Sequence, residues 1–125
     1  MIVADSDVLI DALRGRQPAR ERIDRELGTG QLATTVISVF ELLSGGRTSS
    51  QNDKIKRLLA PLIILPLDQD AARRAAGIRT GLEAQGRGLA MVDYLIAGIC
   101  ISRNAVLLTR NRSHFERVPG LQLEG

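Results

Sequence analysis

Three acidic residues stand alone beside apolar segments of this chain, and their types and positions could support chemistry. Asp5 directly follows the apolar run Ile2–Ala4, and Glu41 is the only charge in the segment V-I-S-V-F-E-L-L-S. Asp93 precedes the apolar segment Tyr94–Ile101. Burying an unpaired charge costs roughly several kcal/mol, so each carboxylate needs a cation or a hydrogen-bond donor. Together they predict one carboxylate cluster, which would repel itself without a divalent cation.

Each acid, taken singly, also has a simple structural alternative. Asp5 could cap a helix that follows its strand, because carboxylates accept hydrogen bonds from the free N–H groups of a helix start. Glu41 could pair with a buried arginine. Asp93 falls in the first turn of a helix, where the helix dipole favours negative charge. These three alternatives stay open on the sequence alone.

The available donors restrict which cation such a cluster could hold. The chain has one cysteine and one histidine, which excludes a cysteine-based zinc site and histidine-rich metal chemistry. Carboxylate oxygens favour Mg²⁺, or alternatively Mn²⁺. We expect Asp5 and Asp93 to be the main metal ligands. Glu41 would complete the shell or orient an attacking water as general base.

The composition indicates one ordinary globular domain over residues 1–125, with 44% hydrophobic and 25% charged residues. The longest apolar stretch, Leu58–Leu67, is interrupted by Pro61 and Pro66, so we expect no membrane segment. Asp5 comes too early for a secretory signal, which predicts a cytoplasmic protein.

The charged residues leave nucleic acid open as a partner. All but two of the 17 basic residues are arginines, whose guanidinium groups bind phosphate oxygens bidentately. Thermal adaptation or GC-rich coding would give the same bias. With one Tyr, two Phe and no Trp, the chain is a poor candidate for a protein that stacks single-stranded bases on aromatic rings.

Apolar periodicity and turn residues predict strands that alternate with helices. The predicted strands are 2–4, 32–35, 62–65, 105–108 and a short 121–123. The predicted helices are 7–13, 18–27, 36–43, one that a capping box of Ser50 and Asp53 opens and that runs to Ala60, one from Asp68 to the glycines at 86 and 88, and 91–102.

Near-continuous apolar strands separated by helices predict an α/β fold with a parallel sheet covered on both faces. In such folds ligands gather at the carboxyl ends of the strands. Two of the predicted strands end in polar residues, Asp5-Ser6-Asp7 and Thr109-Arg110-Asn111. We therefore expect the chemistry at this edge of the sheet.

The chain resembles the PIN-domain ribonucleases, specifically the VapC-type toxins of type II toxin–antitoxin pairs. The resemblance spans essentially the whole chain and lies in four motifs in the family's order: I-V-A-D-S-D-V-L-I-D at 2–11, S-V-F-E-L-L-S-G at 38–45, V-D-Y-L-I-A at 92–97 and L-L-T-R-N-R-S-H-F-E-R at 107–117. It implies a three-layer α/β/α PIN-like fold with a central parallel sheet of four to five strands. The implied catalytic acids are Asp5, Glu41 and Asp93, supported by Ser6 and Asp7.

The last motif departs from the family pattern. Many relatives have a fourth acid in the segment T-x-N-x-x-D-F, and this chain has His114 there. Asn111 remains and Glu116 lies nearby. Asn111 could act through water and His114 could contact phosphate, or the site could bind a second metal weakly or not at all. A surface histidine beside a packed Phe115 is the simpler alternative.

The resemblance further implies Mg²⁺-dependent cleavage of RNA, with transfer or ribosomal RNA as plausible substrates. It also implies a homodimer and inhibition by a cognate VapB-type antitoxin, whose C-terminal segment brings an arginine to the acidic pocket. Leu9, Leu13 and the stretch 36–43 would offer the antitoxin its groove, although core packing is the alternative use of these side chains.

Two other functions compete with this hypothesis. The segment D-S-D-V-L also resembles the first motif of haloacid-dehalogenase-type phosphatases, in which Asp5 would be the nucleophile. That chemistry needs a lysine at the phosphate, and the two lysines, Lys54 and Lys56, fall in a charged predicted helix. The absent fourth acid favours instead a non-catalytic module of the same fold that binds RNA or protein.

Overall fold

The computed structural model describes residues 1–124 and contains a parallel five-stranded sheet. The strands lie in the order β3-β2-β1-β4-β5, so the order reverses beside β1. Their bounds are β1 Ile2–Ala4, β2 Leu32–Thr35, β3 Ile63–Leu65, β4 Val106–Leu108 and β5 Gln122–Leu123. The predicted α/β class and parallel sheet are therefore confirmed, and the topology places β1 and β4 side by side.

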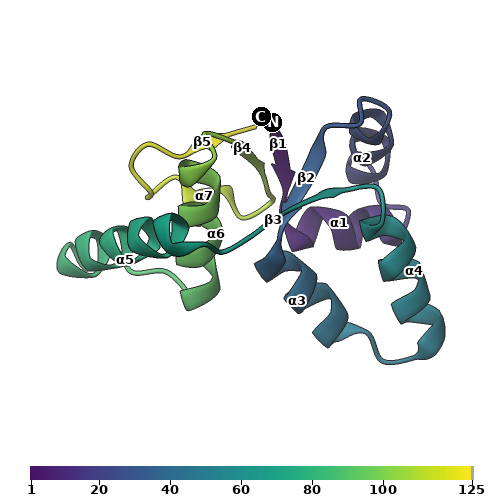
Figure 1. The fold of residues 1–125 in the computed structure, drawn as a ribbon, viewed down its shortest axis with the longest axis horizontal. Helices are drawn as coiled ribbons and strands as arrows, with labels where there is room; N and C mark the ends of the chain where they lie inside the picture. The colour runs from purple at the N-terminus through teal and green to yellow at the C-terminus, as the bar shows by residue number, and fades with distance from the viewer. Residues whose placement is uncertain (125) are drawn as a thin grey trace.

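Helices cover both faces of the sheet, which gives the three-layer arrangement (Figure 1). Figure 1 shows α1 to α4 on one side and α5, α6 and α7 on the other, with both chain ends at the top. The helices within residues 1–124 are α1 Ser6–Leu13, α2 Ala19–Leu27, α3 Val36–Gly45, α4 Ser49–Leu59, α5 Gln69–Ala84, α6 Met91–Ser102 and α7 Arg112–Phe115.

Two apolar clusters hold these layers together, one on each face of the sheet. Val3 of β1 and Leu107 of β4 pack with the buried faces of α5 and α6. The neighbouring Ala4 points the other way and packs with α1, α2 and α4. This alternation follows from the two-residue period of a strand, and it fixes β1 between the two layers. The residue after β1, Asp5, is thereby held at the centre of the sheet edge.

Helices α5 and α6 pack unusually close because small residues line their contact. Ala71 and Ala75 are buried, and they face Gly98 of α6. A Cβ added at Gly98 would lie 2.5 Å from the Ala71 carbonyl oxygen. A larger residue at this position would therefore push the two helices apart, together with the first turn of α6 that carries Asp93.

One predicted helix start is wrong. Helix α4 is capped by Thr48, whose hydroxyl accepts a hydrogen bond from the Gln51 N–H at 3.1 Å. The backbone of Thr48 is extended, as a capping position requires, whereas Ser50 is already helical. The proposed capping box of Ser50 and Asp53 therefore does not form, and Asp53 is an exposed residue inside the helix.

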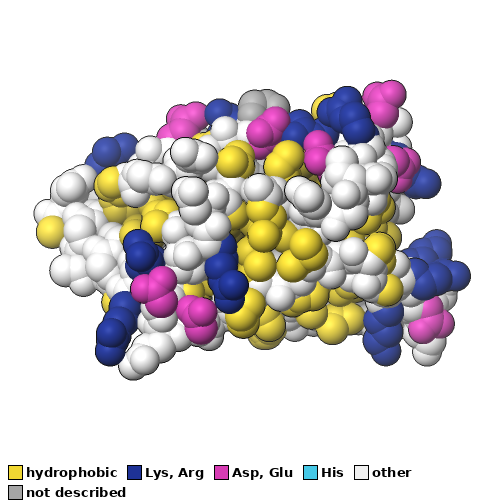
Figure 2. Space-filling view, turned by 45° about the horizontal axis from the view of Figure 1, so that its top comes forward, with side chains coloured by type: hydrophobic (Ala, Val, Ile, Leu, Met, Phe, Trp, Pro, Cys, Tyr) yellow, Lys and Arg dark blue, Asp and Glu magenta, His cyan; other side chains and the backbone are white. Residues whose placement is uncertain are grey.

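Helix α3 exposes apolar side chains to solvent. Its apolar residues Val36, Phe40 and Leu43 are exposed, and Phe40 keeps 60% of its surface accessible. Ile63 and Ile64 of the edge strand β3 are exposed as well. Figure 2 shows hydrophobic side chains gathered in a broad central area of one face, with charged residues mainly around it. Exposed apolar surface is enriched at protein interaction sites.

None of the helices within residues 1–124 is long and apolar enough to cross a membrane.

Candidate active site

Asp5 lies at the carboxyl end of β1, directly beside the end of β4. The two strands are in register with Ala4 opposite Leu108, and the Asp5 N–H donates to the Leu108 carbonyl oxygen at 2.9 Å. This pairing brings Thr109 to Asp5, whose Oδ2 accepts a hydrogen bond from the Thr109 hydroxyl at 2.8 Å. Asp5 is only 6% exposed, so its carboxylate sits at the bottom of the site.

Asp7 follows in the first turn of α1 and faces the same loop after β4. Its Oδ2 accepts a hydrogen bond from the Arg110 backbone N–H at 3.2 Å and lies 3.4 Å from the Thr109 hydroxyl oxygen. Its Oδ1 is buried without a hydrogen-bond partner among the described residues. Asp7 thus has one free carboxylate oxygen inside the site.

Glu41 comes to the site from the middle of α3. Its Oε1 accepts a hydrogen bond from the Ser6 hydroxyl at 3.2 Å, which connects residues 35 positions apart. The start of α3 is fixed by Thr35, whose side chain caps the helix by accepting from the Ser38 N–H at 3.1 Å. Helix α3 begins directly after β2, so the cap sets the direction in which Glu41 projects.

Asp93 lies in the first turn of α6 and is 9% exposed. Burial raises the pKa of Asp93, and the nearby His114 of α7 acts in the opposite direction. The Asn111 amide nitrogen lies 2.9 Å from Nδ1 of His114, which orients the imidazole ring. Glu116 is the other acid near this position, and its Oε1 lies 3.9 Å from Nε of Arg112.

The carboxylates of Asp5, Asp7, Glu41 and Asp93 are close enough to perturb one another. Burial, together with the neighbouring charges of Asp7 and Glu41, raises the pKa of Asp5 to about 7, against the hydrogen bonds from Thr109 and Ser6, which lower it. Burial also raises the pKa of Glu41, as do the charges of Asp93 and Asp7. The pKa of Asp93 is raised by burial and by Asp7. Asp7 is therefore the common neighbour of the other three.

The simple alternatives for the three acids are met only in part. Asp5 does cap α1, because its Oδ1 accepts a hydrogen bond from the Ser6 N–H at 2.8 Å. Asp93 does lie in a first helical turn. No ion pair is formed by Asp5, Glu41 or Asp93 with any described residue, so an arginine partner does not account for Glu41. Each oxygen of Asp5 accepts one hydrogen bond, from the Ser6 N–H and from the Thr109 hydroxyl.

The side chains fit a hard divalent cation in their chemistry but do not form a finished binding site. The facing groups are carboxylate oxygens with raised pKa values, which a cation would lower by neutralising their mutual repulsion. Within residues 1–124, no three His, Cys, Asp or Glu side chains stand at metal-ligating spacing. Binding would therefore have to draw the carboxylates together.

Two residues of this site were not among the sequence-predicted candidates. Thr109 supports both Asp5 and the loop after β4, because its hydroxyl also accepts from the Asn111 N–H at 3.0 Å. Arg110 donates its backbone N–H to Asp7. The sequence signal for both was their place after an apolar strand, which predicted the location but not these contacts.

The sequence of this chain matches a model of a known protein family. The model described as "PIN domain" matches residues 2–121. The chain belongs to the PIN domain family. The match runs from β1 to the residue before β5, so it includes every element that contributes a carboxylate to the site.

Individual relatives agree with the family assignment. The chain is 36% identical over 115 residues to the protein named Ribonuclease VapC10 of Mycobacterium tuberculosis, covering 92% of this chain and 86% of that one. It is 30% identical to the tRNA(fMet)-specific endonuclease VapC of Shigella flexneri, covering 96% and 93%. Among solved structures, VapBC2 from Rickettsia felis, bound to a DNA fragment of its promoter, matches with a TM-score of 0.87 at 27% identity, covering 99% and 98%.

Proposed function

We propose that this PIN domain protein is a divalent-metal-dependent endoribonuclease and the toxin of a toxin–antitoxin pair. The observation that carries the proposal is the convergence of Asp5, Glu41 and Asp93 from β1, α3 and α6 around Asp7. Their charges raise one another's pKa values, and no described arginine or lysine neutralises them. Acids clustered without basic partners do not form structural ion pairs. Such a cluster suits a nuclease that binds a cation.

Asp5 and Asp93 would hold Mg²⁺, with Mn²⁺ as the alternative, and Asp7 adds its free Oδ1 to the same space. A bound divalent cation lowers the pKa of a water molecule and neutralises charge on a phosphodiester. Glu41 has one oxygen bonded to Ser6, and its other oxygen would accept the proton of the attacking water. The raised pKa of Glu41 brings it nearer to the operating pH, which favours this general-base role.

Asn111 and His114 would support the outer side of the site. Their mutual contact at 2.9 Å holds the histidine ring close to Asp93. His114 is exposed, so it is available to donate a hydrogen bond to a phosphate oxygen of the substrate. The residue that replaces the fourth acid of many relatives would thus contact RNA rather than a second metal.

RNA is the substrate that the relatives favour. Two of them carry names that specify a ribonuclease and a tRNA(fMet)-specific endonuclease. The arginine-rich composition of this chain suits the phosphate backbone. Transfer RNA or ribosomal RNA is therefore the substrate class to test first.

A VapB-type antitoxin is the proposed protein partner, since several solved relatives are VapBC complexes. A hollow of about 380 Å³ leads to Glu41 between α1, α3 and α4, and its lining includes Ile10, Leu13 and Leu42. Leu9 was expected in this groove but is fully buried in the core. An apolar antitoxin segment in this hollow would bring its basic residues to the acidic site.

The exposed apolar side chains of α3, above all Phe40, support a homodimer. Because α3 also carries Glu41, self-association through this helix would place the two acidic sites near the dimer contact. This proposal accounts for an apolar surface that would otherwise face water.

The experiment that tests the nuclease proposal is cleavage of a transfer RNA pool with Mg²⁺ by the wild-type chain and by Asp93→Asn. Asp70→Asn is the matched control, since Asp70 is an exposed acid in α5 paired with Arg74. Loss of cleavage in Asp93→Asn alone supports a nuclease whose activity requires Asp93. Equal cleavage by all three chains indicates a contaminating nuclease, and RNA binding without cleavage indicates a non-catalytic module.

A further inference from the structure

Arg110 stands at the edge of the acidic site, yet its charged group pairs with an acid outside that site. Its backbone N–H donates to Oδ2 of Asp7 at 3.2 Å. Its guanidinium lies against Asp11 instead, with Nε 3.1 Å from Oδ2. Among the described residues, Asp11 is the only acid with which Arg110 forms an ion pair. The function proposed above gives Asp11 no part, so this buried acid calls for a role of its own.

The acidic site nearby would attract this guanidinium. Burial raises the pKa of Asp7, whereas the hydrogen bond from the Arg110 N–H and the charge of the Arg110 side chain act in the opposite direction. The guanidinium is therefore within electrostatic reach of Asp7 even while it pairs with Asp11. A guanidinium and a carboxylate match in a bidentate, charge-assisted pair. Such a pair on Asp7 would neutralise part of the site and compete with the cation proposed above.

One turn of α1 separates the two acids that lie near Arg110. Asp7 and Asp11 are four residues apart, so they lie on one face of the helix, about 6 Å apart along its axis. The side chain of Arg110 is 62% exposed, so little packing holds it in place. Exposed side chains change rotamer within nanoseconds. The position of the guanidinium therefore depends mainly on its pairing with Asp11.

Asp11 is a fixed partner for an arginine. It is 7% exposed, and its Oδ1 lies 3.6 Å from a terminal nitrogen of Arg16. The Arg16 N–H donates to the Asp11 carbonyl oxygen at 2.9 Å, which holds the end of α1 together. Water and salt screen a buried charge less than an exposed one. Asp11 thus forms a firm anionic anchor one helical turn from the acidic site.

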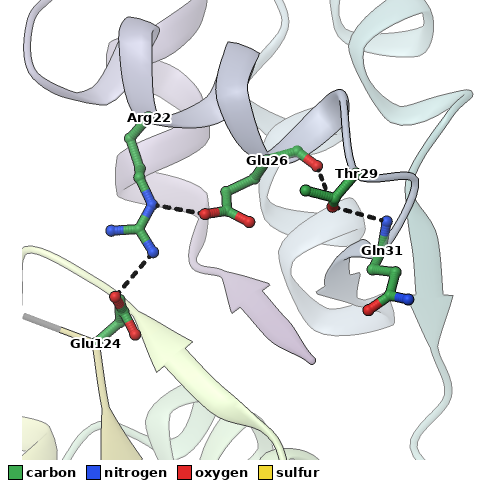
Figure 3. Close-up of polar contacts among 5 residues, drawn as sticks. All are labelled: Arg22, Glu26, Thr29, Gln31 and Glu124. Carbon is green, nitrogen blue, oxygen red and sulfur yellow. Dashed lines mark hydrogen bonds and ion pairs between the residues drawn. The ribbon is translucent and has the colours of Figure 1, made fainter.

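The other acids near Arg110 are less suited to hold it. Glu21 and Glu124 line the same hollow as Arg110, between α1, α2 and the loop after β4. Oε1 of Glu124 is already 2.9 Å from a terminal nitrogen of Arg22 (Figure 3). Glu21 is exposed, and ion pairs with exposed acids contribute little. Asp11 is therefore the acid that decides where the guanidinium lies.

We infer that Asp11 is a positioning residue, which holds the Arg110 guanidinium outside the acidic site and so keeps that site open to a divalent cation. The inference rests on the proposed function for the cation itself. It gives a role to a buried acid that neither binds the cation nor touches the substrate. It also predicts a specific pattern, because removal of Asp11 harms the site only while the guanidinium of Arg110 is present.

The first test is a calorimetric titration of the folded chain with Mn²⁺ at pH 8, without RNA. We expect Asp11→Asn to weaken Mn²⁺ binding at least about tenfold. Arg110→Gln should bind Mn²⁺ like wild type, and adding it to Asp11→Asn should restore the affinity. Unchanged affinity in Asp11→Asn would overturn the inference, because the freed guanidinium would then turn to solvent or to Glu21. Equal weakening in the single and the double variant would overturn it too, because Asp11 would then act through the fold.

Two control variants remove ion pairs of the same kind from the same region. Arg16→Gln removes the second partner of Asp11, and Asp24→Asn removes the acid that lies 3.2 Å from Nε of Arg20. Both should keep the wild-type affinity for Mn²⁺, because both leave the contact between Asp11 and Arg110 in place. A loss in either control as large as that in Asp11→Asn would contradict a specific role of this contact.

A second measurement needs no metal. In nuclear magnetic resonance spectra of the metal-free chain, Asp11→Asn should shift the backbone amides of Ser6 and Asp7, and adding Arg110→Gln should reverse these shifts. If Asp11→Asn does not fold, the wild-type spectrum decides the matter. The Nε–H signal that Arg110→Gln removes should then exchange with water more slowly than that of the exposed Arg25. Equal exchange rates would show that Asp11 does not hold the guanidinium.

The outcomes separate this inference from the proposed function. If wild type binds no Mn²⁺, the proposed metal site is lost, while the amide shifts of the metal-free chain still decide the role of Asp11. If wild type and Asp11→Asn bind Mn²⁺ and cleave RNA equally well, the proposed activity stands and the role of Asp11 is refuted.

Discussion

The Thr109 hydroxyl donates a hydrogen bond to Oδ2 of Asp5 at 2.8 Å, and the two residues directly follow the paired strands β4 and β1. This contact supports a carboxylate that is otherwise surrounded by other acids. It also depends on the register of the sheet, in which Ala4 lies opposite Leu108. The acidic site is therefore built on the two paired central strands of the sheet.

Replacing Thr109 by valine removes this donor while keeping the shape of the side chain. Because the donor stabilises the charged carboxylate, we expect Thr109→Val to lower the free energy of unfolding by about 1–3 kcal/mol at pH 8. The hydrogen bond from Thr109 lowers the pKa of Asp5, so it stabilises the charged carboxylate more than the neutral acid. The loss of stability should therefore be smaller at pH 5, where Asp5 is protonated. Denaturant unfolding at the two pH values measures this, and Thr109→Ser should restore stability. An equal loss at both pH values would show that Thr109 acts through packing alone.

The raised pKa of Asp5 predicts that stability falls as the pH rises. The folded-state value of about 7 lies above the ordinary 3.8, so between these values the folded chain binds the proton and the unfolded chain does not. The proton on Asp5 adds up to about 4 kcal/mol to the free energy of unfolding. This contribution is complete below about pH 4 and is lost as the pH rises through about 7. Asp5→Asn removes the titration, and it should be more stable than wild type at pH 8 and nearly equal at pH 4. If the free energy of unfolding depends on pH in the same way for wild type and Asp5→Asn, the raised pKa of Asp5 is refuted.

Divalent cations should reverse this loss of stability. At pH 8 a cation that binds the carboxylates stabilises only the folded chain, by about 2.7 kcal/mol when its concentration is 100 times the dissociation constant. We expect Mg²⁺ or Mn²⁺ to raise the melting temperature of wild type and of Asp70→Asn but not of Asp5→Asn. The effect should weaken between pH 8 and pH 6 because protons compete for Asp5. A rise of the same size in Asp5→Asn would place the cation elsewhere.

The exposed phenyl ring of Phe40 predicts how the chain associates. Phe40→Asp places a charge in the apolar surface of α3 and should convert a dimer to a monomer in sedimentation velocity runs. Ala84→Asp, an exposed position at the end of α5, is the control and should leave the dimer intact. A wild-type chain that sediments as a monomer across the same concentrations removes the dimer from the account.

The fold, and the edge of the sheet that carries the site, could be predicted because apolar runs and isolated acids are strong local signals. Apolar runs that end in Asp5 and before Thr109 indicated two buried parallel strands, and the structure pairs them. The isolation of Glu41 and Asp93 among apolar residues predicted that both are buried near other acids; Asp93 is buried, whereas Glu41 is only half-buried. Burial and neighbouring acids raise the pKa of both. Their catalytic roles stay predictions.

Other features could not be predicted because they depend on tertiary contacts. The family resemblance implied a supporting role for Asp7, but only the approach of Glu41, Asp93 and the loop after β4 makes it the common neighbour of the site. Helix α3 is apolar on all sides, so its sequence could not show that Phe40 faces outward. The ion pair between Asp11 and Arg110 joins residues distant in sequence, and no local pattern marks it.

The most direct test of the account is anomalous diffraction from crystals soaked in Mn²⁺. The account predicts a peak at roughly 2.0–2.3 Å from carboxylate oxygens of both Asp5 and Asp93, with Glu41 reaching the cation directly or through one water. Crystals of Asp5→Asn soaked in parallel should lack the peak. Wild-type crystals with no manganese among these side chains, or with manganese bound only at other acids, would contradict the central claim that the carboxylates converge to hold a divalent cation.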